Sequence, residues 1–353
     1  MNYLFIINTE GQVHTWKGVI RKLVEKGDYV SIYGRDYGRT LEVLSEEGFK
    51  FRPFKPTRSK AFKALDIFKH ITLGFKARFS FKPAFVLGFG VDASVFAIVA
   101  GATSIIFTDS EPLGMQNTLM RILSTCIITP QKFTIDLGKK HIRIPSYKEL
   151  AYLHPDHFSP DESIIKELGI EKGQQYAILR FNAFDAVHDV GRKGFTLQDK
   201  YNLVECLGKF AKVFISSESD LPEELKQYEL PVSYNRVHDV LYYSNLLIAD
   251  TGTMAVEASV LGTPSIMCLS NYDEFSNFIE LEKEYNLMYC FKDPRQAIKK
   301  AVELIQQPGL KAEWQKKREK LLKEKIDLTA FMVEFIERWP QSFNEQTARQ
   351  VSK

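Results

Sequence analysis

Cysteine is scarce in this chain of 353 residues, and the four that occur, at 126, 206, 268 and 290, are far apart. This spacing excludes a disulfide framework and a cysteine-based metal site. Because each cysteine has apolar neighbours in the sequence, we expect buried free thiols in a reducing cytoplasm. The net charge is also small, at +3, which argues against a general nucleic-acid-binding protein.

A long uninterrupted apolar run is absent as well. The nearest approach is the window 84–107, which contains Asp92 and several glycines, and it is read better as strand, helix and strand than as a membrane span. The N-terminus begins with a strand-like run and lacks a basic stretch, which argues against a signal peptide. We therefore expect a cytoplasmic protein, with a peripheral position at the inner membrane face left open.

The chain instead alternates strand-like and helix-like segments in two successive series. The expected strands are 3–8, 29–34, 84–89, 104–108, 126–130, 176–181, 212–216, 246–249, 264–268 and 287–291. The expected helices are 14–26, 40–47, 61–74, 91–100, 114–124, 196–209, 236–244, 253–261, 294–307 and 310–326. Such alternation predicts an α/β protein with parallel sheets and crossover helices.

The length and the two series together predict two doubly wound domains. A Pro-rich and charged stretch at 153–175 separates them. We expect an N-terminal domain at 1–160 and a C-terminal domain at 170–327; the family resemblance described below implies that the first binds the acceptor and the second the donor. Within residues 328–353 we expect a terminal helix that packs back on the N-terminal domain, followed by a frayed polar tail from residue 341.

One stretch, LLIADTGTMAVEASVLGTPSIMC at 246–268, carries the clearest chemical signal. A strand ends at a Thr-Gly-Thr turn that opens a helix, a position where parallel sheets bind ligands. The glycine permits close approach of a ligand, and the helix N-terminus favours an anion such as a diphosphate. The residues predicted to surround the anion are Thr251, Gly252, Thr253 and Met254.

Glu257 lies one helical turn further, on the same face as Thr253. A carboxylate there would repel phosphate but would accept hydrogen bonds from the diol of a ribose. The alternative is an ordinary buried strand–helix unit with a capping threonine and a solvent-facing glutamate.

This stretch resembles the nucleotide-binding segment of UDP-N-acetylglucosamine 2-epimerases and related GT-B glycosyltransferases. Weaker matches to the same enzymes follow in chain order at 88–112, 117–130, 179–194 and 271–275. The whole pattern is also similar to an uncharacterised family of comparable length that is grouped with them. The resemblance implies a GT-B-like fold, in which two Rossmann-type domains enclose a cleft that holds a nucleotide-diphosphate sugar. The nucleotide sugar that it implies first is a UDP-sugar.

Departures from the epimerase pattern favour sugar transfer. LGMQ at 113–116 replaces the paired glutamates of the epimerases, and the second-domain His-Arg-x-Glu-Asn loop has no equivalent. We therefore expect a glycosyltransferase that acts on a cell-surface polysaccharide or a lipid-linked acceptor. An epimerase that uses Asp92, Asp109 and Glu111 is one alternative, and a nucleotide-sugar-binding protein without catalysis is another.

Further site candidates stand at predicted strand ends and in neighbouring loops. A histidine, whose unperturbed pKa is about 6.5, could accept the proton of the acceptor hydroxyl. Cations would stabilise the leaving diphosphate. The alternatives are capping or packing for His14, a helix N-cap for Asp109 and Glu111, an exposed salt bridge for Arg180, a mobile surface loop for His188 and Arg192, and capping for His238. The catalytic candidates are His14, Glu10, Asp109, Glu111 and Asp92. The added nucleotide-binding candidates are Arg180, His188, Arg192 and His238.

No Asp-x-Asp motif follows a first-domain strand, so we expect neither a metal ion nor any cofactor beyond the donor sugar. Residues 49–82 hold ten Lys or Arg, eight Phe and the single acid Asp66. Basic and aromatic residues together suit an anionic membrane face or a phosphate-bearing lipid, while an amphipathic helix with buried Phe is the alternative. No nucleic-acid partner is expected, and a homodimer is left open.

Overall fold

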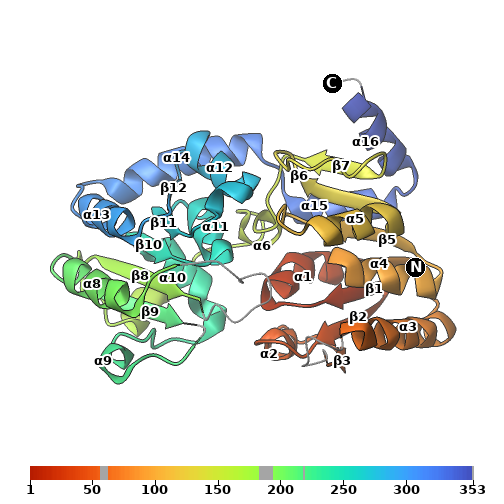
Figure 1. The fold of residues 1–353 in the computed structure, drawn as a ribbon, viewed down its shortest axis with the longest axis horizontal. Coiled ribbons are helices and arrows are strands. Elements are labelled where there is room, and N and C mark those ends of the chain that lie inside the picture. The colour runs from red at the N-terminus through yellow and green to blue at the C-terminus, as the bar shows by residue number, and fades with distance from the viewer. Residues whose placement is uncertain (56–62, 183–193, 218, 352–353) are drawn as a thin grey trace. The chain divides into compact units, whose positions relative to one another are not determined.

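The computed structural model describes residues 1–55, 63–182, 194–217 and 219–351, with the backbone alone at 63–70 and 351. The chain divides into two compact units (Figure 1). Unit 1 comprises Met1–His157 and Ile326–Lys353, and unit 2 comprises Phe158–Lys325. The chain therefore leaves unit 1 after His157 and returns to it at Ile326.

Unit 1 is built on a parallel sheet of seven strands in the order β3-β2-β1-β4-β5-β6-β7. The strands are β1 (Asn2–Ile7), β2 (Tyr29–Arg35), β3 (Arg52–Phe54), β4 (Phe85–Phe89), β5 (Thr103–Phe107), β6 (Cys126–Pro130) and β7 (His141–Ile144). Their central residues are almost wholly apolar and buried, as expected for a parallel sheet with both faces covered. The strand order reverses direction between β1 and β4.

Helices cover both faces of this sheet. They are α1 (Glu10–Glu25), α2 (Thr40–Glu46), α3 (Lys63–Ser80), α4 (Gly90–Ala100), α5 (Gly114–Leu123), α6 (Leu150–Leu153), α15 (Leu328–Glu337) and α16 (Gln341–Val351). On one face α1 packs against α2, α6 and α15. On the other, α3 packs against α4 and α4 against α5, because right-handed crossovers place helices on opposite faces when the strand order reverses.

Unit 2 repeats this plan on a parallel sheet of five strands in the order β12-β11-β10-β8-β9. The strands are β8 (Tyr176–Phe181), β9 (Lys212–Ser217), β10 (Leu246–Ala249), β11 (Ser265–Cys268) and β12 (Met288–Phe291). The helices are α7 (Ser163–Glu167), α8 (Leu197–Leu207), α9 (Glu223–Lys226), α10 (Val237–Tyr243), α11 (Gly252–Val260), α12 (Ser276–Lys283), α13 (Pro294–Ile305) and α14 (Leu310–Glu324). Here the order reverses between β8 and β10. The predicted α/β class with two parallel-sheet units is confirmed.

Several predicted details are wrong or incomplete. The supposedly frayed tail forms α16, which packs against α15 and β7, and Gln350 donates a hydrogen bond to the Arg143 carbonyl at 3.2 Å. The short strands β3 and β7 and the helix α12 were not predicted, because three to eight residues carry little periodicity.

The cysteines are free thiols, as predicted, and three of them are buried, whereas Cys206 is half-buried. Among the described residues, no helix combines the length and the apolar character that crossing a bilayer requires.

Candidate functional site

The point where the strand order of unit 2 reverses lies between β8 and β10, and ligands bind such points in open parallel sheets. Asp250 follows β10 and is almost wholly buried. Its carboxylate accepts hydrogen bonds from the backbone N–H of Asn182 at 2.7 Å and of Phe195 at 3.2 Å. Burial raises the pKa of Asp250 to about 6. Asp250 thus anchors both flanks of residues 183–193 to the sheet edge.

Helix α11 begins directly after this carboxylate. Its N-cap, Thr251, is extended, with φ −119° and ψ 138°, and its side chain makes no capping hydrogen bond within the described chain. Thr251, Gly252 and Thr253 are half-buried, whereas Met254 is buried. The first N–H groups of a helix have no partner inside it, so this turn has the geometry of an anion-binding terminus. Thr251 therefore holds the N-cap position of the alternative reading, but its side chain does not cap the helix.

Gly252 has a packing reason that the sequence did not reveal. A Cβ atom at this position would lie 2.7 Å from Cζ of Phe278. Phe278 is itself buried, and its ring centroid lies 5.0 Å from that of Phe275. Helix α12 therefore closes over the turn so tightly that only glycine fits. Close packing accounts for this residue, and close approach of a ligand stays a prediction.

Glu257 lies one turn inside α11 and is 5% exposed, so the alternative of a solvent-facing glutamate is also wrong. Its Oε1 is 3.2 Å from Nε2 of His238 on α10, and the ring of Phe158 packs edge-on against His238 at 6.2 Å. Two residues that were predicted separately for the nucleotide site are thus joined. A histidine beside the carboxylate holds it in a defined orientation.

Arg180, near the carboxyl end of β8, points toward the neighbouring strand. Its Nη1 donates to Oγ of Ser216 on β9 at 3.0 Å, and the side chain is buried. On the same sheet edge Lys200 lies over the Phe181 ring at 4.6 Å and contributes positive charge near Asp250. Cationic groups therefore do lie at this edge of unit 2. The predicted site residues His188 and Arg192 fall outside the described residues.

In unit 1 the strand order reverses between β1 and β4, and two of the polar residues following these strands meet. Nδ2 of Asn8 donates to Oδ2 of Asp92 at 3.3 Å, and the Asn8 N–H donates to Gln12 at 2.8 Å. Gly90, with φ +71°, makes the turn from β4 into α4, a conformation that glycine adopts without strain. Asp92, predicted as a catalytic acid, thus stands at the reversal point of unit 1.

The other predicted acids of unit 1 follow β5. Oδ2 of Asp109 is 2.6 Å from Nζ of Lys148, which also lies 3.6 Å from the buried carboxylate of Glu149. Glu111 is buried, and its carbonyl accepts a hydrogen bond from Asn117 on α5 at 3.0 Å. The alternative of a helix cap is wrong here, because α5 begins only at Gly114.

His14 and Glu10 both lie inside the first helix. Glu10 is the first residue of α1, which begins four residues before the predicted start. His14 is buried, and its ring lies 5.3 Å from the Tyr152 ring on α6. This environment matches the packing alternative for His14 and gives it limited access to a substrate.

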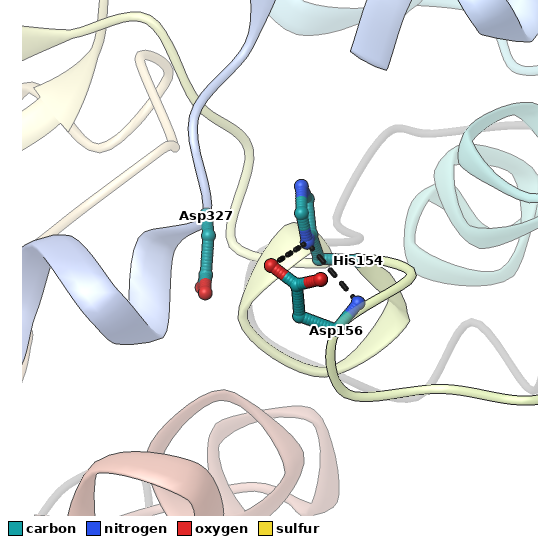
Figure 2. Close-up of side chains that lie close together, drawn as sticks. All are labelled: His154, Asp156 and Asp327. Atoms are coloured by element: carbon teal, nitrogen blue, oxygen red, sulfur yellow. Dashed lines mark hydrogen bonds and ion pairs between the residues drawn. The ribbon is translucent and has the colours of Figure 1, made fainter.

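A different group of side chains could hold a metal ion. His154, Asp156 and Asp327 present ligand atoms within 4.8 Å of one another (Figure 2). Nε2 of His157 lies 2.8 Å from Oδ2 of Asp327. Burial opposes ionisation of Asp327, but the hydrogen bonds from His157 and from the Ala330 N–H, together with the charges of His157 and His154, outweigh it and keep the pKa of this carboxyl below its usual range. The four residues tie together the two segments of unit 1.

Sequence reasoning missed three polar residues at these sheet edges. Asp250 was visible as the acid directly after a predicted strand, a position that favours ligand contact. Asn8 follows the first strand in the same way. Lys148 had no such signal, because the strand before it, β7, was not predicted, and its partner Asp109 is 39 residues away in the sequence.

The comparisons with known proteins concern the family and the fold. The family model described as "Protein of unknown function (DUF354)" matches residues 3–339. No curated protein matches the chain.

Several solved structures share its fold. A putative UDP-N-acetylglucosamine 2-epimerase from Listeria monocytogenes superposes with a TM-score of 0.69 at 13% identity, over 95% of each chain. The UDP-GlcNAc 2-epimerase from Neisseria meningitidis, solved with UDP-GlcNAc bound, gives 0.64 at 15% identity, over 96% of this chain and 100% of that one. A glycosyltransferase of kitacinnamycin gives 0.62 at 14% identity, over 96% and 98%. These similarities confirm the predicted GT-B-like fold.

Proposed function

We propose that this chain, which belongs to the family described as DUF354, transfers a sugar from a nucleotide diphosphate to a glycan or a lipid-linked acceptor. The first candidate for the nucleotide is UDP. The single observation that carries the proposal is the turn from β10 into α11. There an uncapped helix N-terminus stands at the strand-order reversal of unit 2, with a buried glutamate one turn deeper.

In this proposal the diphosphate lies against the N–H groups and hydroxyls of Thr251, Gly252 and Thr253. The helix dipole stabilises the negative charge that grows on the leaving diphosphate. Glu257, oriented by His238, accepts hydrogen bonds from the ribose hydroxyls. Arg180 lies on the strand beside β10 and adds positive charge to the donor site.

The chemical step breaks the bond between the sugar C1 and the diphosphate oxygen, which leaves with the electron pair. The acceptor hydroxyl forms the new bond to C1, and its proton passes to a carboxylate that acts as a general base. Asp92 is our first candidate because it stands at the strand-order reversal, and Asp109 is the second. A conservative Asp92→Asn or Asp109→Asn change should lower kcat while the donor Kd stays constant.

Epimerisation is the second candidate, favoured by the likeness to structures of UDP-GlcNAc 2-epimerases. An epimerase moves the C2 proton of the donor and needs no acceptor. Incubation with UDP-GlcNAc in deuterium oxide distinguishes the two. Deuterium at C2 without acceptor would establish epimerisation and refute the transferase. Turnover that occurs only with added acceptor would support the transferase.

The donor site is tested by titration calorimetry with UDP, GDP, CDP and dTDP. We expect one of these to bind, and Glu257→Ala to weaken it by about 1.5–3 kcal/mol, the range for a hydrogen bond to a charged group. The matched control is Glu303→Ala, which removes a half-exposed glutamate of the same unit. Equal affinity of both variants, with circular dichroism unchanged, would refute the ribose assignment. No binding of any nucleotide would refute the function itself.

A further inference from the structure

The outer surface of three helices in unit 1 is apolar where a water-facing layer should be polar. Of the twelve large apolar side chains that are exposed in the described part of the chain, six belong to α3, α4 and α5. Met115, Phe79 and Ile122 are 79%, 74% and 65% exposed. We call this surface the α3–α5 face; its apolar members are Phe75, Phe79, Ile98, Met115, Leu119 and Ile122.

The exposed apolar residues of α5 all lie on one side of that helix. Met115, Leu119 and Ile122 follow one another at intervals of four and three, which places them on one side of α5. The opposite side of α5 is buried through Asn117 and Met120. This helix therefore has apolar residues on its outer side, whereas the outer side of a helix facing water is normally polar.

The three helices form one layer, so their outer sides are continuous. Gly74 of α3 permits close contact with α4, because a Cβ there would lie 2.9 Å from the Val99 side chain. Oγ of Ser94 on α4 is 2.8 Å from Oγ of Ser124 at the end of α5. Figure 1 shows the labelled helices on the right-hand part of the molecule. Exposed apolar side chains gathered on neighbouring helices in this way indicate an interaction surface.

Charge identifies the kind of partner. Lys76, Arg78, Lys82 and Arg121 are exposed along the same layer. Three of these four belong to the helices, and Lys82 follows α3. Against the three, the described side chains of α3, α4 and α5 include one acid, Asp92, at the amino end of α4. Lysine is depleted from interfaces between protein copies, and two such faces would bring like charges together. Basic side chains beside exposed apolar ones match an anionic lipid surface.

We propose that the α3–α5 face docks unit 1 peripherally on a bilayer that contains anionic lipid. The inference goes beyond the proposed function and stands without it, since it requires neither donor nor acceptor. It also relocates the membrane contact expected for 49–82. Phe54 of that region is in the core, Phe75 and Phe79 are exposed, and α4 and α5 supply the rest of the face. Residues 56–62 lie outside the described structure.

The test is co-sedimentation of the full-length protein with phosphatidylcholine vesicles that contain or lack phosphatidylglycerol. We expect binding to the anionic vesicles alone, weakened by salt because surface charges are screened. The double variant Phe79→Ser, Ile122→Ser should lower the binding constant about tenfold or more, since each side chain loses its transfer into the interface. Lys76→Glu with Arg121→Glu should lower it similarly, and only at low salt.

The matched control is Leu197→Ser with Phe210→Ser, two exposed apolar residues of unit 2. This variant should bind like the wild type. Absence of vesicle binding would overturn the inference, as would equal binding of control and face variants. A dimer in solution that Ile122→Ser dissociates, without vesicle binding, would assign the face to a second copy instead. Circular dichroism of each variant excludes loss of folding as the cause.

Discussion

A glycine-to-alanine change at the start of α11 separates packing from ligand binding. In Gly252→Ala the new Cβ would lie 2.7 Å from Cζ of Phe278, about 1 Å closer than the optimal separation of two carbons of ~3.5–4.0 Å. Overpacking of this kind costs about 1–3 kcal/mol. The loss of unfolded-state freedom returns about 0.4–1 kcal/mol. From the middle of each range we expect a net destabilisation of about 1.3 kcal/mol, measured by urea unfolding.

The companion variant Phe278→Leu provides the discrimination. It shortens the side chain at the point of collision, so the double variant Gly252→Ala, Phe278→Leu should regain part of the stability that Gly252→Ala loses relative to Phe278→Leu alone. If the glycine also admits a diphosphate, the double variant should still bind the nucleotide weakly, because the added methyl remains at the helix N-terminus. Unchanged stability of the single variant would refute the packing argument. Normal nucleotide affinity of the double variant would refute the close-approach argument.

The other predictions concern buried charges. Burial raises the pKa of Asp250 from 3.8 to about 6, so between these pH values the folded state binds a proton that the unfolded state does not. The stabilisation that this proton provides is lost as the pH rises through the window. The free energy of unfolding should therefore fall by about 1.4 kcal/mol between pH 5 and 7.5. Asp250→Asn should remove this part of the pH dependence in urea unfolding, and the same pH dependence in both proteins would contradict the argument. Glu280 and Lys325 form a buried ion pair at 2.5 Å, so Glu280→Gln alone should cost about 3–5 kcal/mol, while Glu280→Leu with Lys325→Met should cost much less. Thermal unfolding checks this, and an equally unstable double variant would count against it. For His157 and Asp327, a double-mutant cycle should give a coupling of about 1 kcal/mol; additive effects would show that the hydrogen bond contributes nothing.

Much of the secondary structure was accessible from sequence because long apolar strands and amphipathic helices have a clear periodicity. The strands β1, β4, β5, β6 and β8 are continuous buried runs, and their order along the chain alternates with helices. Short edge elements such as β3 lack such a signal. The terminal α16 was hidden by its polar composition, although its packing on β7 stabilises it.

The turn from β10 into α11 was predictable for a similar physical reason. A strand, a glycine turn and a helix occur consecutively, so local chemistry indicates an anion site before any tertiary contact is known. The resemblance to nucleotide-sugar enzymes came from the same consecutive residues. The α3–α5 face was only partly visible, because the pattern of exposed Met, Leu and Ile on α5 looks like an ordinary buried helix face until the neighbours are known.

The sequence by itself determined the α/β class, the two series of parallel strands and the residues that follow their carboxyl ends. It did so because periodicity and turn chemistry act between neighbours in the chain. Only the tertiary structure decided that Asp250 bonds to Asn182 and Phe195, that His238 meets Glu257, and that α5 turns its apolar side outward. These pairings depend on which strands lie adjacent and which helix faces are covered, and residues distant in sequence meet only when the sheets have formed.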